Sequence, residues 1–300
     1  MQESSSPPGR GGFPVPAAQL GRVVITSTRY KPRAQEIARE LAGYARRAGV
    51  EVFLDLEGDA PLREEAQGAG AIIAVGGDGT LLGTARRLVG VSVPVLGVNL
   101  GKLGFLAEHS VDDIIAYLQG ATPDGWRLNP KMMLEVRLNG NERPAHYALN
   151  DVIVAQGVMT RLIEIGMEVD GRYATEYRAD GLVVSSPTGS TAYSLSLGGP
   201  ILGQGLRALV ITPIAPHSLT NRPVVLEGDS VVSFEVHQGS RELALVVDGQ
   251  ERVDLGAGDR FTVTAAPTDL VMVTPGRLGY FDILRHKLDW GARPRLDEAD

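Results

Sequence analysis

The stretch that decides the fold is Ala71-Ile72-Ile73-Ala74-Val75-Gly76-Gly77-Asp78-Gly79-Thr80. Its first five residues are apolar and uncharged, which is typical of a strand buried on both faces. A glycine-rich turn follows, and Thr80 is the predicted N-cap of a helix over 81–88. A strand, a glycine turn and a helix start bring several backbone N–H groups together at the positive end of the helix dipole. The stretch therefore predicts a phosphate-binding loop.

Asp78 is the unusual residue of this loop, because bound phosphates repel a carboxylate. A functional carboxylate there would either hold Mg²⁺ or accept a proton from an attacking hydroxyl. The ten residues leave an alternative open, in which Asp78 only forms an Asx-turn between its glycine neighbours.

The composition is that of a globular protein of about two domains. The chain has 300 residues, of which 43% are hydrophobic and 22% charged, and its net charge is −7. The negative charge and the lack of a long basic run argue against nucleic acid and against an anionic membrane as partners. Cysteine is absent, which excludes disulfides and thiolate metal sites and fits a cytoplasmic protein.

The sequence shows no membrane-spanning or signal segment. No apolar run approaches the roughly 20 residues of a membrane span, and the first residues lack the basic start and apolar centre of a signal peptide. We expect residues 1–20 and 293–300 to be disordered tails.

The first half of the chain alternates strand and helix patterns. Strands are predicted at 23–26, 50–56, 71–75 and 93–98, and helices at 32–48 and 81–88. Ser110 and Asp113 are spaced as a capping box before a further helix. Alternating strands and helices predict a three-layer α/β domain over 21–123 with a mostly parallel sheet. Such sheets bind ligands at the carboxyl ends of their strands, where the glycine turn lies.

The second half, 124–274, predicts a β-rich, sandwich-like domain. Helical periodicity is nearly absent, and short strand patterns are predicted at 132–138, 144–149, 151–155, 162–169, 173–177, 181–185, 209–213, 231–236, 243–247 and 260–265. Asn139-Gly140 and Asp170-Gly171 stand between strands as hairpin turns. The apolar segment 279–284 indicates that about 275–292 packs back on the first domain.

Two common nucleotide-binding motifs are absent. The stretch 97–103 has three residues between Gly97 and Gly101-Lys102 and ends in leucine, so it is not a Walker loop. No Gly-x-Gly-x-x-Gly opens a helix after the first strand.

The stretch 178–200 is the densest in ligand-binding residue types. Its glycines and small hydroxyl residues let a ligand approach the backbone closely. Tyr193 offers a flat face for a base, and Arg178 and Asp180 supply a cation and an acceptor. The alternative is a Ser/Thr-rich surface loop with Tyr193 filling the core.

Five motifs in order resemble those of bacterial-type NAD kinases. They are Gly76–Thr80, Asn99–Leu106, Asp180–Pro200, Pro216–Thr220 and Asp248–Gln250, and the likeness spans about 23–284. The first motif is shared with diacylglycerol and sphingosine kinases and loosely with phosphofructokinases, whereas the second and third are more specific. The resemblance implies an enzyme that transfers a phosphoryl group from ATP, another nucleoside triphosphate or polyphosphate to NAD.

The resemblance also implies roles for individual residues. Asp78 would accept the proton of the 2′-hydroxyl of the adenosine ribose. The loop residues Gly76, Gly77, Gly79 and Thr80 would hold the phosphates of the donor. The NAD pocket would comprise Asp78, Gly79, Asn150, Asp151, Arg161, Arg178, Asp180, Thr191, Ala192, Tyr193, Ser194, Leu195, Ser196, Ala215 and Gln250. A divalent metal ion, Mg²⁺, would bind through the substrate phosphates, and the chain would form a homodimer or homotetramer.

The sequence departs from the family pattern at three positions. Asp151 stands where the family usually has Glu, which shortens the carboxylate by one methylene and changes its reach. Ala179 and Ser186 stand where the family usually has Gly and Thr. Lys102 is expected either to touch a phosphate or to be solvated.

Two other functions remain open from the sequence. A lipid kinase would share the loop 76–80 but would need an apolar slot for acyl chains, whereas 180–196 is polar. A non-catalytic NAD(H) sensor would keep the pocket but would gain nothing from Asp78. The sequence fixes neither the phosphoryl donor nor the preference between NAD and NADH.

Overall fold

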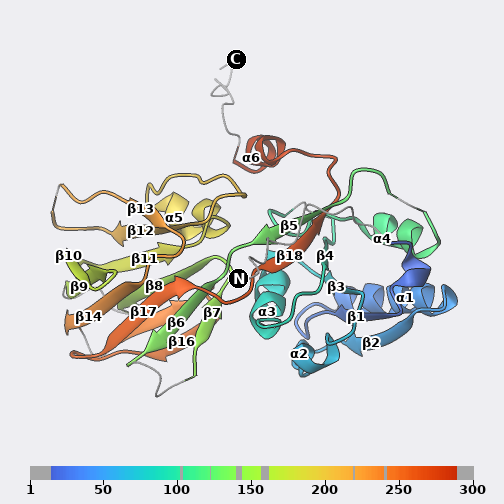
Figure 1. Ribbon diagram of the computed structural model, residues 1–300, viewed down its shortest axis with the longest axis horizontal. Helices are drawn as coiled ribbons and strands as arrows, with labels where there is room; N and C mark the ends of the chain where they lie inside the picture. Colours follow the sequence, from blue (N-terminus) through green and yellow to red (C-terminus); the bar gives the residue numbers. More distant parts are fainter. Residues whose placement is uncertain are drawn as a thin grey trace, which may run out of the picture.

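Two domains lie side by side in the computed structural model, an α/β domain and an all-β domain (Figure 1). The structure describes residues 15–101, 104–121, 123–139, 144–156, 162–218, 220–239 and 242–288. The predictions for Arg161, for Lys102 and for the tails 1–14 and 293–300 therefore lie outside the described residues. None of the described helices is both long and apolar enough to cross a membrane.

The first domain is built on a six-stranded sheet in the order β2-β1-β3-β4-β18-β5. The strands are β1 (Arg22–Thr26), β2 (Glu51–Asp55), β3 (Ala71–Val75), β4 (Val95–Val98), β5 (Arg127–Lys131) and β18 (Leu270–Thr274). All neighbours are parallel except β5, which runs antiparallel to β18 at the edge. The predicted, mostly parallel sheet is confirmed.

Strands β5 and β18 correct the predicted domain division. The sequence prediction placed 124–274 in the second domain, but both strands pair in the first sheet, where Met272 of β18 stands opposite Val95 of β4. The prediction was wrong there because pairing between segments far apart in the chain leaves no local signal.

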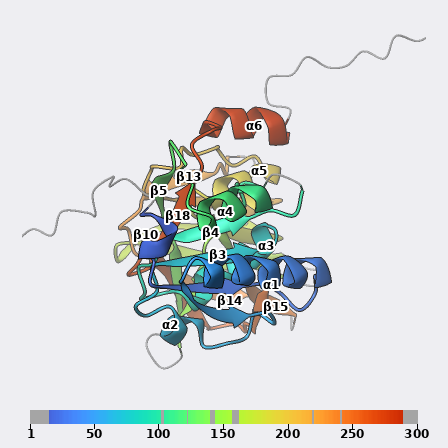
Figure 2. The ribbon, with the colours of Figure 1, turned by 90° about the vertical axis from the view of Figure 1, so that its right-hand side faces the viewer.

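Helices cover both faces of this sheet and make the three predicted layers. Helices α1 (Pro32–Arg47) and α4 (Val111–Leu118) pack on one face, as Figure 2 shows. Helices α2 (Leu62–Glu65) and α3 (Asp78–Arg87) pack on the other. Because successive side chains of a strand point to opposite faces, β1 contributes Val23 and Ile25 to one core and Val24 to the other.

One of the two predicted helix caps is confirmed. The Asp113 N–H donates to Ser110 Oγ at 3.2 Å and the Ser110 N–H donates to Asp113 Oδ2 at 2.8 Å, which completes a capping box. Thr80 is not a cap, because α3 begins at Asp78 with Gly77 at the N-cap. Thr80 instead packs on Gly76, where an added Cβ would lie 2.2 Å from Thr80 Oγ1.

Residues 15–20 are part of the first domain and not of a tail. The short 3₁₀ helix η1 (Ala17–Gln19) buries Ala17, and Leu20 is 4% exposed. The Tyr117 hydroxyl of α4 donates to the Val15 carbonyl at 2.7 Å. The segment is too short for hydrophobic periodicity to reveal it, which is why the prediction of a tail to residue 20 was wrong.

The second domain is a sandwich of two six-stranded antiparallel sheets, as predicted. Their orders are β10-β9-β14-β17-β6-β7 and β13-β12-β11-β8-β15-β16. The strands are β6 (Leu134–Leu138), β7 (His146–Ala148), β8 (Asp151–Gln156), β9 (Ile163–Val169), β10 (Arg172–Ala179), β11 (Gly181–Ser185), β12 (Ala208–Ile214), β13 (Val224–Glu227), β14 (Val232–Gln238), β15 (Leu243–Val247), β16 (Glu251–Asp254) and β17 (Arg260–Ala265). Their inward side chains form one core, which includes Val154, Leu182 and Phe234.

One of the two predicted hairpin turns of this domain is confirmed. Asp170 and Gly171 both adopt positive φ angles, 53° and 74°, and connect β9 to β10. Asn139 also has a positive φ of 48°, but Gly140 lies outside the described residues. Strand β7, which pairs with β6, begins only at His146, so a two-residue hairpin at 139–140 is not confirmed. Two short helical turns, η2 (Gly189–Thr191) and α5 (Tyr193–Ser196), follow β11.

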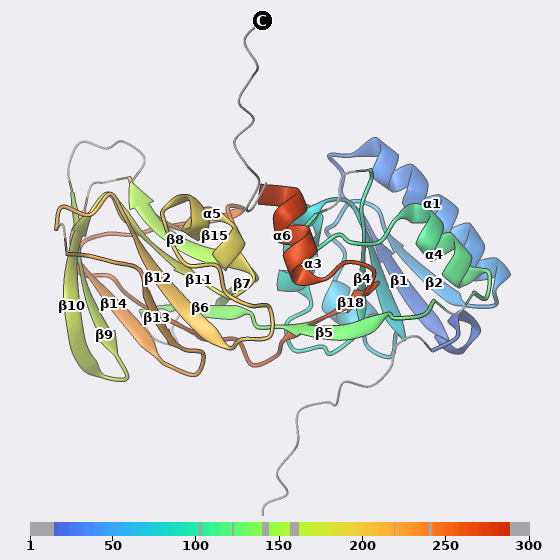
Figure 3. The same ribbon diagram turned by 90° about the horizontal axis from the view of Figure 1, so that it is seen from above.

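The C-terminal segment contacts both domains. Arg277 pairs with Asp113 at the start of α4 in the first domain. Helix α6 (Tyr280–Leu288) follows, and the Tyr280 hydroxyl donates to the Leu202 carbonyl of the second domain at 2.8 Å. Helix α6 accordingly lies over the junction of the domains (Figure 3). The C-terminal segment was expected to pack on the first domain; it contacts the first domain and the second domain as well.

Replacing Ser110 by Ala is expected to destabilise the first domain by about 1 kcal/mol, because the Asp113 N–H loses its acceptor. The urea midpoint of unfolding measures the effect. Ser92→Ala, at an exposed position before β4, serves as the control and should shift stability by less than about 0.5 kcal/mol. Equal midpoints for the two variants would contradict the capping assignment.

Candidate active site at the domain junction

The Asp78 side chain is held by a loop that follows β4. Its Oδ2 accepts the Phe105 N–H at 3.0 Å, and its Oδ1 accepts the N–H groups of Leu106 and Ala107, each at 3.2 Å. Gly104 packs so closely that an added Cβ would lie 2.1 Å from Oδ1. Since each carboxylate oxygen accepts about two hydrogen bonds, Oδ1 is filled, whereas Oδ2 keeps one acceptor position that none of the described residues occupies.

This contact pattern argues against the Asx-turn interpretation of Asp78. An Asx-turn would bond the carboxylate to an amide two residues on. The carboxylate is bonded to 105–107 instead, so the residue links two loops at the carboxyl ends of β3 and β4. The chain thus fixes one carboxylate orientation at the N-terminus of α3.

The glycine loop in front of α3 faces a cation and the second domain. The Lys31 ammonium lies 3.5 Å from the position that a Cβ on Gly77 would take. On the other side, Gln250 Nε2 donates to the Gly79 carbonyl at 3.0 Å. Sequence reasoning did not include Lys31, because it precedes α1 and nothing local connects it to the loop.

A buried carboxylate shapes the turn that carries Asn150 and Asp151. Asp248 accepts the Leu149 N–H at 3.0 Å through Oδ2, and the N–H groups of Asn150 and Asp151 at 2.8 and 3.2 Å through Oδ1. Asp248 has a φ of 49°, in the left-handed region that Asp and Asn tolerate best after glycine. It begins the turn between β15 and β16, which Gln250 closes by donating its N–H to the Val247 carbonyl.

The segment 186–193 packs directly on this turn. A Cβ on Gly189 would lie 2.0 Å from the Asn150 carbonyl oxygen, so only glycine fits. The Ser186 hydroxyl donates to the Leu149 carbonyl at 2.5 Å. The Tyr193 N–H lowers the pKa of the Asp151 carboxyl group. These contacts bring Asn150 and Asp151 next to the stretch that contains the predicted pocket residues 191–193.

Two buried carboxyl groups therefore lie close together. Burial, together with the nearby Asp248 carboxylate, raises the pKa of Asp151 to about 7, while the Tyr193 N–H opposes both effects. Burial also raises the pKa of Asp248, against the lowering effect of its backbone hydrogen bonds and of Arg86. Carboxyl groups with displaced pKa values cluster at functional sites.

The other predicted pocket residues divide into two groups. On η2 and α5, Tyr193 is 41% exposed, whereas Ser194 is buried with its hydroxyl bonded to Thr212 Oγ1 at 2.9 Å. The remaining four residues of this stretch are partly or fully exposed: Thr191, Ala192, Leu195 and Ser196. The Ser194 hydroxyl is thus buried and hydrogen-bonded within the protein.

Arg178, Asp180 and Ala215 lie on adjoining backbone. The Asp180 N–H donates to the carbonyl of Ile214, which precedes Ala215, at 3.0 Å. The Arg178 side chain is 62% exposed and pairs with Glu164 of β9 at 3.1 Å. The structure gives these residues no contact with Asp78.

A second charged group beside the site escaped sequence reasoning. Lys131 is 2% exposed, and its ammonium donates to Gln204 Oε1 at 2.6 Å. Burial lowers the pKa of Lys131 to about 8. Burial, together with the nearby Asp78 carboxylate, raises the pKa of Glu108 to about 7. No local pattern signals such a pair, since β5 and the loop after β4 meet only in the folded chain.

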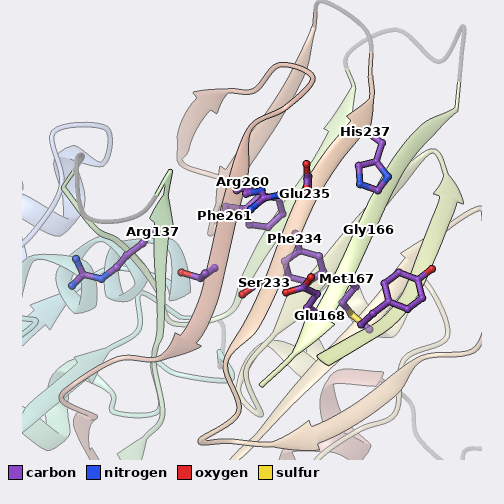
Figure 4. Close-up of a pocket in the computed structure, with 12 residues that line it drawn as sticks. Arg137, Gly166, Met167, Glu168, Ser233, Phe234, Glu235, His237, Arg260 and Phe261 are labelled. Atoms are coloured by element: carbon purple, nitrogen blue, oxygen red, sulfur yellow. Dashed lines mark hydrogen bonds and ion pairs between the residues drawn. The ribbon is translucent and has the colours of Figure 1, made fainter. Parts of the chain in front are cut away.

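A pocket elsewhere in the molecule does not belong to this site. It measures about 290 Å³ and lies on the sheet of β9, β14 and β17 (Figure 4). Its lining includes Gly166, Glu168, Glu235, His237 and Arg260. None of the predicted site residues within the described part of the chain lines it.

Two family models match the chain. The ATP-NAD kinase N-terminal domain matches residues 23–123, and the ATP-NAD kinase C-terminal domain matches residues 149–274. An NAD kinase from Syntrophotalea carbinolica is 38% identical over 285 residues, which cover 91% of this chain and 100% of that relative. The chain belongs to the NAD kinase family. The resemblance inferred from the five motifs is confirmed, and the lipid-kinase alternative is not favoured.

Further relatives and solved structures of this family agree. The NAD kinase of Geobacter sulfurreducens is 40% identical over 284 residues, with 91% of this chain and 100% of the relative covered. The crystal structure of yeast NADH kinase complexed with NADH matches with a TM-score of 0.80 and 25% identity over 92% of this chain and 89% of that one. An NAD kinase from Archaeoglobus fulgidus in complex with ATP matches with a TM-score of 0.67 and 26% identity over 84% and 92%. The predicted fold class is confirmed.

Replacing Asp151 by Asn is expected to stabilise the chain more at pH 8 than at pH 5. Because burial raises the pKa of Asp151 from 3.8 to about 7, the folded chain retains a proton that the unfolded chain releases. Stability of the unchanged protein therefore falls as pH rises through that window. Asparagine stays neutral and removes this loss. Free energies of unfolding in urea at both pH values measure it.

Asp229→Asn, at an exposed position between β13 and β14, is the matched control and should show no such pH-dependent gain. A gain for Asp151→Asn that is no larger at pH 8 than at pH 5 would contradict the raised pKa.

Proposed function

We propose that this chain transfers a phosphoryl group from ATP, another nucleoside triphosphate or polyphosphate to the 2′-hydroxyl of the adenosine ribose of NAD, giving NADP. The observation that carries the proposal is the Asp78 carboxylate, fixed by three amides with one acceptor position left on Oδ2. Solved relatives described as complexes with NADH and with ATP support the two substrates.

The donor phosphates are assigned to the loop 76–80. The N-terminus of α3 presents free N–H groups and the positive end of its dipole, which attract phosphate oxygens. The Lys31 ammonium beside Gly77 adds a full positive charge at the same place. Phosphoryl transfer depends mainly on such positioning and charge neutralisation.

The acceptor hydroxyl is assigned to the open position on Asp78 Oδ2. A hydrogen bond from the ribose 2′-hydroxyl to Oδ2 would orient its oxygen toward the donor phosphorus. Because the transition state of phosphoryl transfer is loose, the proton leaves late, and orientation is the larger contribution of the carboxylate. Asp78 then takes the proton as the new phosphate ester forms.

The rest of NAD is assigned to the second domain. Asn150 and Asp151 lie on the turn that Asp248 holds, and Tyr193 offers a partly exposed ring for an aromatic base. Arg178, Asp180, Ala215 and Thr191 to Ser196 stay proposed pocket residues. The Gln250 side chain bonds to Gly79 and Arg86, which assigns it a contact between the domains.

A divalent metal ion, Mg²⁺, is proposed to enter with the donor as part of the substrate. Among the described residues, no group of three or more His, Asp or Glu side chains is arranged to hold a metal. The proposal therefore assigns the ion to the phosphates of ATP, which bind Mg²⁺ readily.

The proposal also includes a cytoplasmic homodimer or homotetramer. The lack of cysteine fits a reducing compartment. Light scattering on the purified chain distinguishes either assembly from a monomer.

Asp78→Asn is expected to lower turnover by about 10²–10⁴-fold while NAD still binds. The amide oxygen can keep the Leu106 and Ala107 bonds, but the NH₂ group cannot accept a hydrogen bond from a hydroxyl. NADP formation in steady state and NAD titration calorimetry measure the two effects. Asp229→Asn should keep normal turnover, and near-normal turnover of Asp78→Asn would overturn the assigned role.

Removal of divalent cations with EDTA is expected to stop NADP formation and leave the calorimetric affinity for NAD within about threefold. Added Mg²⁺ should restore turnover, because the ion belongs to the donor complex. Sustained turnover in metal-free buffer would exclude this role of Mg²⁺.

A further inference from the structure

Arg86 connects the helix that carries Asp78 to the second domain. It lies in the last turn of α3, and its side chain is 12% exposed. Its Nη1 pairs with Asp248 Oδ2 at 3.2 Å, its Nε pairs with Glu251 Oε1 at 3.0 Å, and its Nη2 donates to Gln250 Oε1 at 2.6 Å. One guanidinium thus binds three residues of the turn between β15 and β16.

The same turn, residues 248–251, holds two other parts of the site. Gln250 Nε2 donates to the Gly79 carbonyl in the first turn of α3. The Asp248 carboxylate accepts the N–H groups of Leu149, Asn150 and Asp151. The turn 248–251 therefore contacts both ends of α3 and the turn that bears Asn150 and Asp151.

Helix geometry explains why the contacts at Gly79 and Arg86 are enough to place α3 against the second domain. Gly79 and Arg86 are seven residues apart, which corresponds to about 10 Å along a rigid helix. Contacts near both ends fix the position of the helix along the domain junction and its rotation about its own axis. Asp78 at the N-terminus of α3 then has a defined place relative to Asn150 and Asp151.

We propose that Arg86 is a positioning residue for phosphoryl transfer, which sets the Asp78 carboxylate against the acceptor-binding turn through residues 248–251. The proposal rests on the proposed function. It adds a residue to which neither the sequence motifs nor the family comparison gives a role. Arg86 acts through Asp248 and Gln250 and does not touch the reacting atoms.

The electrostatics make Arg86 hard to replace. The Asp248 side chain is fully buried, and its only ion-pair partner among the described residues is Arg86. A buried carboxylate that loses its cation is strongly destabilised, so the turn would shift to reach water or take up a proton. Other charges face this cluster: Asp151 lies near Asp248, and His146 Nδ1 lies 3.2 Å from Glu251 Oε2.

The first test compares Arg86→Met with the unchanged chain. Methionine keeps the apolar stem and removes all donors and the charge. We expect kcat to fall about 10- to 100-fold, because a displacement of about 1 Å at the reacting groups has that effect. The KM and the calorimetric dissociation constant for NAD should stay within about threefold, since all of NAD except the acceptor hydroxyl is assigned to the second domain.

A second variant, Arg86→Lys, tests the proposal if Arg86→Met does not fold. Arg86→Lys keeps a cation for Asp248 but cannot bind three residues at once. It should fold and show a smaller kcat loss, between about 3- and 30-fold. Circular dichroism and the thermal midpoint establish the folded fraction, and kcat is expressed per folded molecule.

A double-mutant cycle separates positioning from general stability. If Arg86 acts by placing Asp78, then Arg86→Met should cost less than about threefold in an Asp78→Asn background. If Arg86 contributed to stability alone, Arg86→Met would leave kcat per folded molecule almost unchanged, both in the unchanged chain and in Asp78→Asn. A full 10-fold or larger loss in the Asp78→Asn background would show that Arg86 acts independently of Asp78 and would overturn the proposal.

Arg87→Met is the matched control on the same helix. Arg87 binds Asp55 Oδ2 and the Ala60 carbonyl, both within the first domain. It should lose stability but keep kcat within about threefold per folded molecule. An equal kcat loss for Arg87→Met and Arg86→Met would refute a specific role of the domain contact.

NADP formation by the unchanged chain separates the proposed function from the positioning role of Arg86. If it forms NADP from NAD and a phosphoryl donor but Arg86→Met and Arg86→Lys keep kcat within threefold, the positioning role fails and the proposed function stands. If the unchanged chain binds NAD without forming NADP, the proposed function fails and the positioning role fails with it.

Discussion

The junction depends on one buried carboxylate. Asp248 accepts three consecutive backbone N–H groups at 149–151 and pairs with Arg86 of the other domain. Without Asp248 the three N–H groups would lose this acceptor, and unpaired buried polar groups are costly. The left-handed backbone of Asp248 shows that the chain accepts local strain to place this carboxylate. The position of α3 relative to the second domain follows from it.

The site concentrates charges that are partly withdrawn from water. Asp151, Asp248 and Glu108 are carboxyl groups whose pKa values burial raises, and Lys131 is an ammonium whose pKa burial lowers. Such groups interact strongly because little solvent screens them. Asp78 differs from them, since three amides from 105–107 orient its carboxylate. The site thus combines one oriented carboxylate, Asp78, with a buried one, Asp248, that holds the backbone of 149–151.

Local sequence signals predicted the elements but not how they pair. The capping box at Ser110 and the hairpin at Asp170-Gly171 are confirmed because a few adjacent residues determine each. The cap at Thr80 was wrong, since Gly77 and Asp78 begin the helix earlier. Strands β5 and β18 were assigned to the wrong domain, because their pairing joins segments about 140 residues apart. The site residues Arg86 and Lys131 went unnoticed for the same reason.

The sequence by itself determined the strand, glycine turn and helix around Asp78, the alternation that makes an α/β domain, and the motifs that identify the family. Those features are written in neighbouring residues and need no distant contact. Only the tertiary structure decided that Asp78 is held by 105–107, that Gly189 packs on Asn150, and that Arg86 meets Asp248. Each of those contacts joins segments that lie far apart in the sequence, so its energy exists only in the folded chain. The contact of Arg86 with Asp248 also requires that the two domains lie against one another.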